Sequence, residues 1–323
     1  MHDIRLALGL MGFLSIGIFM LFRRLLRSAP PRTLDAIAVG LILLIAAYLK
    51  YIWGQLWIVN WIPLPSVIVL SNWFPLLLAA MAAVVWIRMG GEASNLKQNG
   101  VEPKSSGGSE HTESSLIDRI LDVRRVVMMG VIVAGAVYSG MYFVPAEPPE
   151  CGDDWIQPVP PFVWPVCLQT NPTTCSAASS ATVLHTLGIQ TTEQEMAELC
   201  LTRNGTTWLG LYHGLTMKLL GTQHRVKFFE CDITDLPALA ANSPLLLCCE
   251  LQSMTARHVP EYETEGGWKP GVAHSVVYFG RLQGHHIVGD PSRGYEIWSH
   301  EDLEILWTRQ GLRIVTPPDS DTS

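Results

Sequence analysis

The chain has 323 residues, enough for two folded units of ordinary size, and 48% of them are hydrophobic, which is high for a wholly water-soluble protein. Its formal net charge of -7 excludes the basic surface on which nucleic-acid binding depends. The apolar residues form long runs before residue 144, whereas polar and apolar residues alternate after it. We therefore expect one half of the chain in a lipid bilayer and the other half in water.

Four apolar segments of the first half are each long enough to cross the roughly 30 Å hydrocarbon core of a bilayer as a helix. They cover residues 4–22, 34–53, 67–87 and 126–144, so the sequence predicts an all-α membrane region with four transmembrane helices over residues 1–144. Arginines, not a small-residue cleavage site, follow the first segment. We expect a retained helix there, not a signal peptide.

Basic residues predict the orientation of these helices. They are concentrated between the first and second segments and between the third and fourth: Arg23, Arg24, Arg27, Arg32, Arg88, Lys97, Lys104, Arg119, Arg124 and Arg125. Because lysine and arginine are enriched in cytoplasmic loops, both loops, including the polar and flexible segment 88–125, are expected in the cytoplasm. The N-terminus and everything after residue 144 are then expected outside the cytoplasm, on the periplasmic or outer face.

All seven cysteines follow the last apolar segment, a distribution that suggests an oxidising compartment. If one of them is a catalytic thiol, the other six could form three disulfides or remain buried free thiols, and the sequence leaves both readings open. These six are Cys151, Cys167, Cys200, Cys231, Cys248 and Cys249.

The second half is predicted to be an α+β domain over residues 167–323, reached through a proline-rich, extended connector at 145–166. Helices are expected from Cys175 toward Leu187, after a capping box at Thr192 and Glu195, over 207–220, and over about 232–241. Strands of an antiparallel sheet are expected at residues 225–231, 245–251, 273–280, 285–290, 295–298 and 312–316.

One cysteine stands where a nucleophile is expected. Cys175 follows the loop Gln169-Thr170-Asn171-Pro172-Thr173-Thr174 and begins a helix of small residues. The unpaired N–H groups and the dipole of a helix N-terminus favour an anion, which lowers a thiol pKa. Gln169 is close enough in sequence to donate its side-chain amide to an oxyanion that develops at the same point.

A cysteine nucleophile also needs a base and a group that orients the base. His274 begins one predicted strand, and Asp290 ends the next strand along the chain. Two adjacent antiparallel strands would bring both side chains to one edge of the sheet. We therefore predict that His274 takes the proton of Cys175 and that Asp290 orients its imidazole.

Gln-x5-Cys, followed far downstream by His-x-Val-Val and then by Asp-Pro, resembles the bacteriocin-processing, double-glycine peptidase family over roughly Cys167 to Val315. The resemblance implies a papain-like fold, with a helical subdomain and an antiparallel sheet, in which Gln169, Cys175, His274 and Asp290 are the catalytic residues. The chain departs from the family pattern at Ser176, where members usually have glycine, and no nucleotide-binding segment follows. It therefore resembles stand-alone, membrane-tethered members without an ATPase.

The expected function is a membrane-anchored thiol peptidase that hydrolyses peptide or protein substrates outside the cytoplasm, with the bilayer as its other partner. The alternative is an inactive peptidase-like domain that binds a secreted peptide or an exporter. A transporter role for the helices is disfavoured because they carry almost no charged interior residue. No cofactor or metal is expected, because cysteine and histidine pairs lack zinc spacing. Seven other histidines are taken as structural or solvated: His185, His213, His224, His258, His285, His286 and His300.

Overall fold

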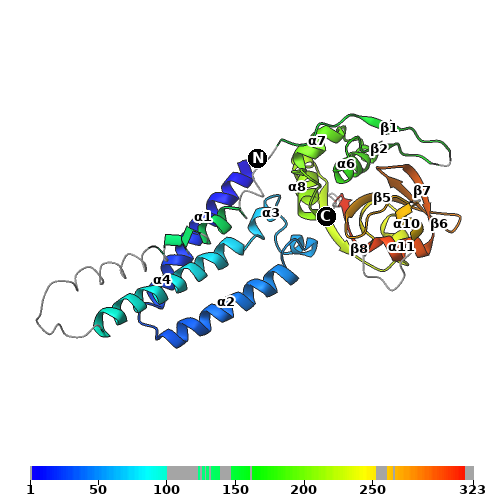
Figure 1. Cartoon of the computed structure of the whole chain (residues 1–323). Coiled ribbons are helices and arrows are strands. Elements are labelled where there is room, and N and C mark those ends of the chain that lie inside the picture. The colour runs from blue at the N-terminus through cyan, green and yellow to red at the C-terminus, as the bar shows by residue number, and fades with distance from the viewer. Residues whose placement is uncertain are drawn as a thin grey trace, which may run out of the picture. The chain divides into compact units, whose positions relative to one another are not determined.

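The computed structural model describes residues 2–99, 123, 126–127, 129–130, 132–138, 147–160, 162–251, 260–264 and 266–316 (Figure 1). The chain divides into two compact units. The first unit comprises Met1–Trp53 and Val69–Val144, and the second comprises Gly54–Ile68 and Pro145–Ser323. The segment between the second and third predicted spans thus belongs to the second unit, where the 3-10 helix Leu56–Asn60 contacts strand β3, Arg225–Glu230.

The first unit consists of long apolar helices. These are α1 (His2–Leu25), α2 (Pro31–Tyr51) and α4 (Phe74–Asn99). The short α3 (Val67–Leu70), which precedes α4, begins in the second unit and ends in the first. Helix α4 packs against both α1 and α2. Large apolar side chains of α1 point outward, with Leu6 77% and Phe13 73% exposed. Such surfaces are unfavourable in water and favourable in hydrocarbon.

Within the described residues, three segments are long and apolar enough to cross a membrane, namely His2–Leu25, Pro31–Tyr51 and Val67–Gly90. They correspond to the first three predicted spans. The fourth predicted span, 126–144, lies only partly on described residues, of which 132–138 are helical. Most of the predicted loop 88–125 lies outside the described residues.

The second unit is built on a six-stranded antiparallel sheet, which confirms the predicted α+β class. Its strand order is β3-β8-β4-β5-β6-β7. Besides β3, the strands are β4 (Leu245–Glu250), β5 (Ala273–Leu282), β6 (His285–Asp290), β7 (Gly294–Trp298) and β8 (Trp307–Val315). The run Leu245–Cys249 of β4 is buried throughout. This is the pattern of a central strand that is covered on both faces.

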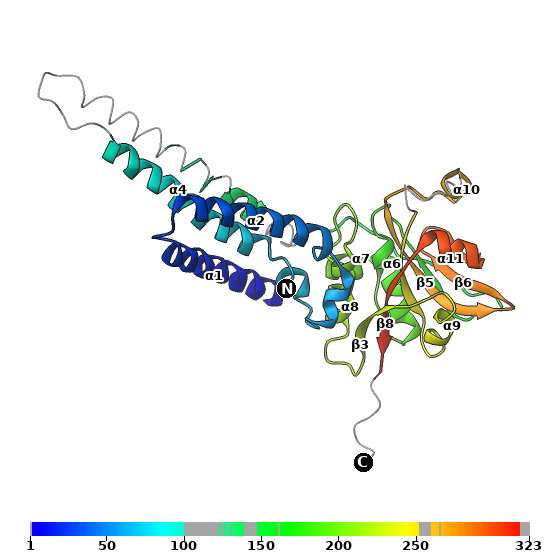
Figure 2. The same ribbon diagram turned by 90° about the horizontal axis from the view of Figure 1, so that it is seen from below.

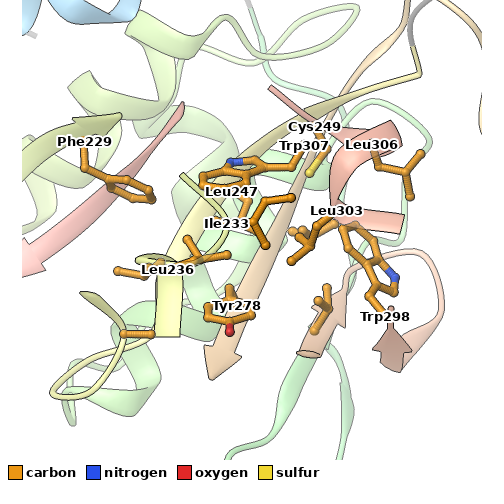
Figure 3. Close-up of a cluster of buried hydrophobic side chains, with 14 of the residues drawn as sticks. Phe229, Ile233, Leu236, Leu247, Cys249, Tyr278, Trp298, Leu303, Leu306 and Trp307 are labelled. Atoms are coloured by element: carbon orange, nitrogen blue, oxygen red, sulfur yellow. The ribbon is translucent and has the colours of Figure 1, made fainter. Parts of the chain in front are cut away.

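Helices cover the two faces of the sheet. On one face, α6 (Cys175–Thr186) packs on β5, on α7 (Glu193–Leu199) and on α8 (Trp208–Lys218). The short helix α9 (Leu236–Leu239) and α11 (His300–Leu306) lie on the other side of the strands (Figure 2). The core beneath them is a cluster of aromatic and aliphatic side chains (Figure 3), which includes Phe229, Ile233, Leu236, Leu247, Cys249, Tyr278, Trp298, Leu303, Leu306 and Trp307.

Several predicted elements differ from the observed ones. The connector 145–166 contains strand β1, Asp154–Ile156, which pairs with β2, Val166–Leu168, because the chain doubles back across the intervening prolines. The helix expected at 232–241 is only the single turn α9. Strand β8 begins at Trp307, five positions before the predicted start, because it pairs with both β3 and β4.

Helix α11 was not predicted, although the sequence carries its signal. The Ser299 side chain accepts a hydrogen bond from Asp302 N, and the Asp302 side chain accepts one from Ser299 N, which is a complete capping box. The same pattern was recognised at Thr192, whose side chain accepts from Glu195 N at the start of α7. A short helix of seven residues offers too few turns for an apolar periodicity to reveal it.

Gly311 allows β8 to lie between β3 and β4. A Cβ atom at this position would come within 2.2 Å of the Leu246 carbonyl oxygen and 2.6 Å of a Phe229 ring carbon. We expect Gly311→Ala to lower the free energy of unfolding by about 1–3 kcal/mol, the usual cost of overpacking a core. Denaturant unfolding of the full chain in detergent, followed by tryptophan fluorescence, measures the change.

The control for this prediction is Gln310→Ala at the neighbouring, half-buried position of the same strand. It should change the free energy of unfolding by less than about 0.5 kcal/mol, as is usual outside cores. Equal effects of the two substitutions would contradict the assigned packing.

Candidate active site

Cys175 is the first residue of α6, and its side chain is partly exposed. The preceding residue, Thr174, caps the helix through its backbone without a side-chain cap. Small residues from Ser176 to Ala181 are buried along the helix, which brings its backbone close to β5. The sulfur therefore lies at the positive end of a helix dipole, beside the start of a central strand.

The loop before α6 is held by several hydrogen bonds. Gln169 N donates to Pro291 O at 2.7 Å, which joins the loop to the residue after β6. Ser292 Oγ donates to Gln169 Oε1 at 3.1 Å, and Gln169 Nε2 donates to Asn171 O at 3.2 Å. A primary amide carries two N–H donors, so Gln169 keeps a second one. The amide is oriented on both its oxygen and its nitrogen.

His274 and Asp290 are brought together by the pairing of β5 with β6. His274 Nε2 lies 3.0 Å from Asp290 Oδ1, and the side chains are 17% and 4% exposed. Ser292 N also donates to Asp290 Oδ1, at 2.6 Å, and this turn fixes the carboxylate. The carboxylate is therefore held by a backbone donor and is aimed at the imidazole.

Cys175 and His274 are hydrogen-bonded to each other through their side chains. Because Nε2 of His274 is directed at Asp290, its Nδ1 is the nitrogen left for the sulfur. Burial raises the pKa of the Cys175 thiol, but the bond and charge of His274, the Ser275 backbone N–H and the Ser176 side chain outweigh burial and lower it overall. Burial lowers the pKa of His274, but Asp290 and Cys175 raise it to about 10.

These two shifts define a pH window for an imidazolium–thiolate pair. The raised pKa of His274 stabilises the folded state below the ordinary histidine value, and this contribution is lost as the pH rises through about 10. The lowered pKa of Cys175 stabilises it above the ordinary thiol value, and this contribution is lost as the pH falls through the lowered value. The pair is thus present between the lowered thiol pKa and about pH 10.

Gln169, Cys175, His274 and Asp290 all line one cavity of about 370 Å³. Trp268, Lys269 and Arg293 lie on its other walls. The structure therefore brings together all four residues that the sequence singled out, although they span more than a hundred positions of the chain. The arrangement places a thiol, an imidazole, a carboxylate and a primary amide at one open site.

Two residues of the site were missed by sequence reasoning. The Trp268 ring lies edge-on to the His274 imidazole, with 5.1 Å between ring centroids. Glu193 is fully buried, and its carboxylate accepts from Thr170 N at 3.0 Å and contacts the hydroxyls of Thr170 and Thr174. Glu193 thereby holds both ends of the loop before Cys175. In the sequence it stands between Thr192 and Glu195 of the capping box, and nothing in its local pattern indicates burial.

Several of the rival histidines have other partners in the described residues. His286 Nδ1 lies 2.9 Å from the Tyr278 hydroxyl, and His213 Nδ1 lies 2.8 Å from Leu199 O. His258 lies outside the described residues. In the part of the chain that the structure describes, no cluster of three or more His, Cys, Asp or Glu residues could hold a metal ion.

All seven cysteines are free thiols. The reading with three disulfides among Cys151, Cys167, Cys200, Cys231, Cys248 and Cys249 is therefore wrong for this structure, and the reading with free thiols holds. Burial raises the pKa of these six thiols.

No family model matches the chain, and no curated protein matches it. Among solved structures, it is similar to the peptidase domain of Streptococcus ComA, described as a bi-functional ABC transporter involved in a quorum sensing pathway. The identity is 21% and the TM-score 0.36, over 46% of this chain and 95% of that chain.

Two further solved structures are similar at comparable levels. One is the peptidase domain of Streptococcus mutans ComA, with 19% identity and a TM-score of 0.32 over 46% of this chain and 98% of that one. The other is a double glycine motif protease from the AMS/PCAT transporter in complex with the leader peptide, with 18% identity and a TM-score of 0.35 over 49% and 97%.

The lowered pKa of Cys175 predicts selective alkylation. At pH 7 iodoacetamide should modify Cys175 well before the other six cysteines, because only its thiol is shifted toward the reactive thiolate. His274→Ala should slow this alkylation at least about tenfold, since each unit of thiol pKa changes the thiolate fraction tenfold. Mass spectrometry of the tryptic peptides quantifies each site.

Cys231→Ala is the control, because Cys231 is partly exposed but its thiol pKa is raised to about 11. This substitution should leave the rate at Cys175 unchanged. Uniform alkylation of all exposed cysteines would show that Cys175 has no special environment.

Proposed function

We propose that the chain is a membrane-anchored cysteine peptidase that hydrolyses peptide bonds through an acyl-thioester. The observation that supports this proposal best is that Cys175 interacts with His274, and His274 with Asp290, on the wall of one open cavity. A thiolate beside an imidazolium is the activated form of a cysteine nucleophile. The sequence resemblance to double-glycine peptidases agrees with this chemistry and with these residues.

The first half of the proposed reaction forms the thioester. The Cys175 thiolate attacks the substrate carbonyl carbon, and the carbonyl oxygen becomes an oxyanion. The free N–H of Gln169 Nε2 and the backbone N–H of Cys175 are the donors proposed for it. The His274 imidazolium gives its Nδ1 proton to the leaving amine as the carbon–nitrogen bond breaks.

The second half regenerates the enzyme. Neutral His274 removes a proton from a water molecule, and the resulting hydroxide attacks the thioester carbonyl. The carbon–sulfur bond then breaks, which releases a carboxylic acid and restores the thiolate beside the imidazolium. Asp290 keeps its contact with Nε2 throughout, which stabilises the charged imidazole and holds Nδ1 toward the sulfur.

Cys175→Ala should abolish cleavage of a peptide library by the full chain in detergent, because the thioester cannot form. Gln169→Ala should lower kcat by about 10²–10³-fold with a smaller change in KM, as expected when an oxyanion donor is removed. Mass spectrometry of the products gives both the rates and the cleaved bonds. Cys231→Ala should cleave at the wild-type rate.

The alternative is an inactive domain that captures a peptide. Under that function, Cys175→Ala would retain the peptides that the wild type binds, and no peptide would be cut by either protein. Absence of any cleavage, together with retained binding, would therefore replace the enzymatic proposal by the binding one.

We also propose that the second unit lies outside the cytoplasm. Support comes from the arginines and lysines in the loops after the first and third spans, which favour the cytoplasm for those loops. Four crossings before residue 144 would return the chain to the side of its N-terminus.

A membrane-impermeant maleimide tests this orientation. Applied to intact spheroplasts of expressing cells, it should label Cys175, and Cys175→Ala should lose the signal. A Ser106→Cys substitution in the Cys175→Ala background, within the predicted cytoplasmic loop, should be labelled only after lysis. The reverse pattern of labelling would invert the proposed topology.

A further inference from the structure

Two buried serines stand next to the proposed catalytic residues. Ser176 follows Cys175 on α6, and Ser275 follows His274 on β5. Their hydroxyl oxygens are 2.7 Å apart, and the residues are 2% and 0% exposed. Helix and strand are thus joined by a side-chain hydrogen bond immediately beside the nucleophile and the base.

The number of hydroxyl hydrogens determines which serine of this pair donates and which accepts. Hydrogen bonds from the Ser275 backbone N–H and the Ser176 side chain also lower the pKa of the Cys175 thiol. A hydroxyl has a single hydrogen. If Ser176 donates that hydrogen to the sulfur, it can only accept from Ser275. A thiolate accepts such bonds far better than a neutral thiol, since hydrogen bonds to charged groups are the stronger ones.

We propose that Ser275 and Ser176 are positioning residues that form a directed hydroxyl chain, Ser275 Oγ–H to Ser176 Oγ and Ser176 Oγ–H to Cys175 Sγ, which holds the sulfur as a thiolate facing His274. The inference deepens the proposed function and rests on it, because it concerns the same nucleophile. It also gives a physical role to Ser176, the position at which the chain departs from the glycine of the family that it resembles.

Other charged or titratable groups face the sulfur from several elements. His274 lies on β5 and Asp290 at the end of β6. Cys249 on β4 interacts with Cys175, and its own thiol pKa is raised by burial. Lys269 and Arg293 are on the cavity wall. None of these groups is altered when a serine hydroxyl is removed, so a serine variant isolates the contribution of the chain.

Ser179 offers a matched control. It is buried on the same helix, and its hydroxyl donates to the Ser275 carbonyl oxygen at 2.9 Å. Removal of this hydroxyl breaks a buried hydrogen bond between the same helix and the same strand. It leaves the hydroxyl chain to the sulfur intact.

The test measures the alkylation rate of Cys175 by iodoacetamide against pH, with the full chain in detergent and mass spectrometry of the Cys175 peptide. We expect Ser176→Ala to raise the midpoint of the profile by about one pH unit, as for loss of one hydrogen bond to a charged group. Ser275→Ala should raise it less, because its effect passes through Ser176. Ser275→Thr, which keeps the hydroxyl, should restore the wild-type midpoint.

The double variant Ser176→Ala/Ser275→Ala should show the midpoint of Ser176→Ala alone, because residues in one chain are not additive. Ser179→Ala should keep the wild-type midpoint although its melting temperature falls. A wild-type midpoint in Ser176→Ala, or an equal shift in Ser179→Ala, would overturn the proposal. If Ser176→Ala does not fold, the two Ser275 variants provide the test. A raised midpoint in Ser275→Ala and a wild-type midpoint in Ser275→Thr would support the proposal, and equal midpoints would overturn it.

This readout is separate from peptide cleavage. A shifted midpoint in Ser176→Ala without cleavage by any variant would keep the hydroxyl chain and reject the peptidase function. If cleavage depends on Cys175 but Ser176→Ala keeps the wild-type midpoint, the peptidase function is kept and the hydroxyl chain is rejected.

Discussion

The N-terminus of α6 packs against the start of β5, and the geometry of the candidate site depends on this junction. The helix carries Cys175 at its first position, and the strand carries His274 at its second. Only small side chains, from Ser176 to Ala181, lie at the buried face of the helix near this point. A larger residue there would separate the sulfur from the imidazole, since close-packed interiors transmit changes of a single methylene.

The electrostatic state of the site follows from that contact. Burial by itself favours the neutral thiol and the neutral imidazole, so neither group would be charged at neutral pH if it were alone. Together, the two groups stabilise each other's charged forms, and Asp290 adds a carboxylate on the far side of the imidazole. The charged state of the thiol and the imidazole therefore depends on all three residues together and not on any one of them.

Other hydrogen bonds fix the loop that precedes Cys175 and the turn that follows β6. Glu193 fixes the loop before Cys175 through Thr170 and Thr174, and the backbone of Gln169 is tied to Pro291. The same short segment after β6 holds Asp290 through Ser292 N. The loop with the amide donor and the turn with the carboxylate are therefore one hydrogen-bonded assembly, which limits how far either can move independently.

The sequence by itself determined the elements whose signal is local. Long apolar runs predicted four membrane-length helices, of which the described residues contain three. Runs with the composition of strands predicted the sheet, and the small-residue helix start marked Cys175. It missed α11 and the early start of β8, because a two-turn helix and a strand between two partners show no periodicity of their own.

Only the tertiary structure decided which polar groups meet. The contact of Cys175 with His274, the burial of Glu193 and the pairing of Ser176 with Ser275 join residues from different helices and strands. It also decided that the cysteines are free, because a disulfide requires two sulfurs to lie in suitable geometry, which spacing along the chain does not give. Distances between side chains are set by packing, and packing is a property of the whole fold.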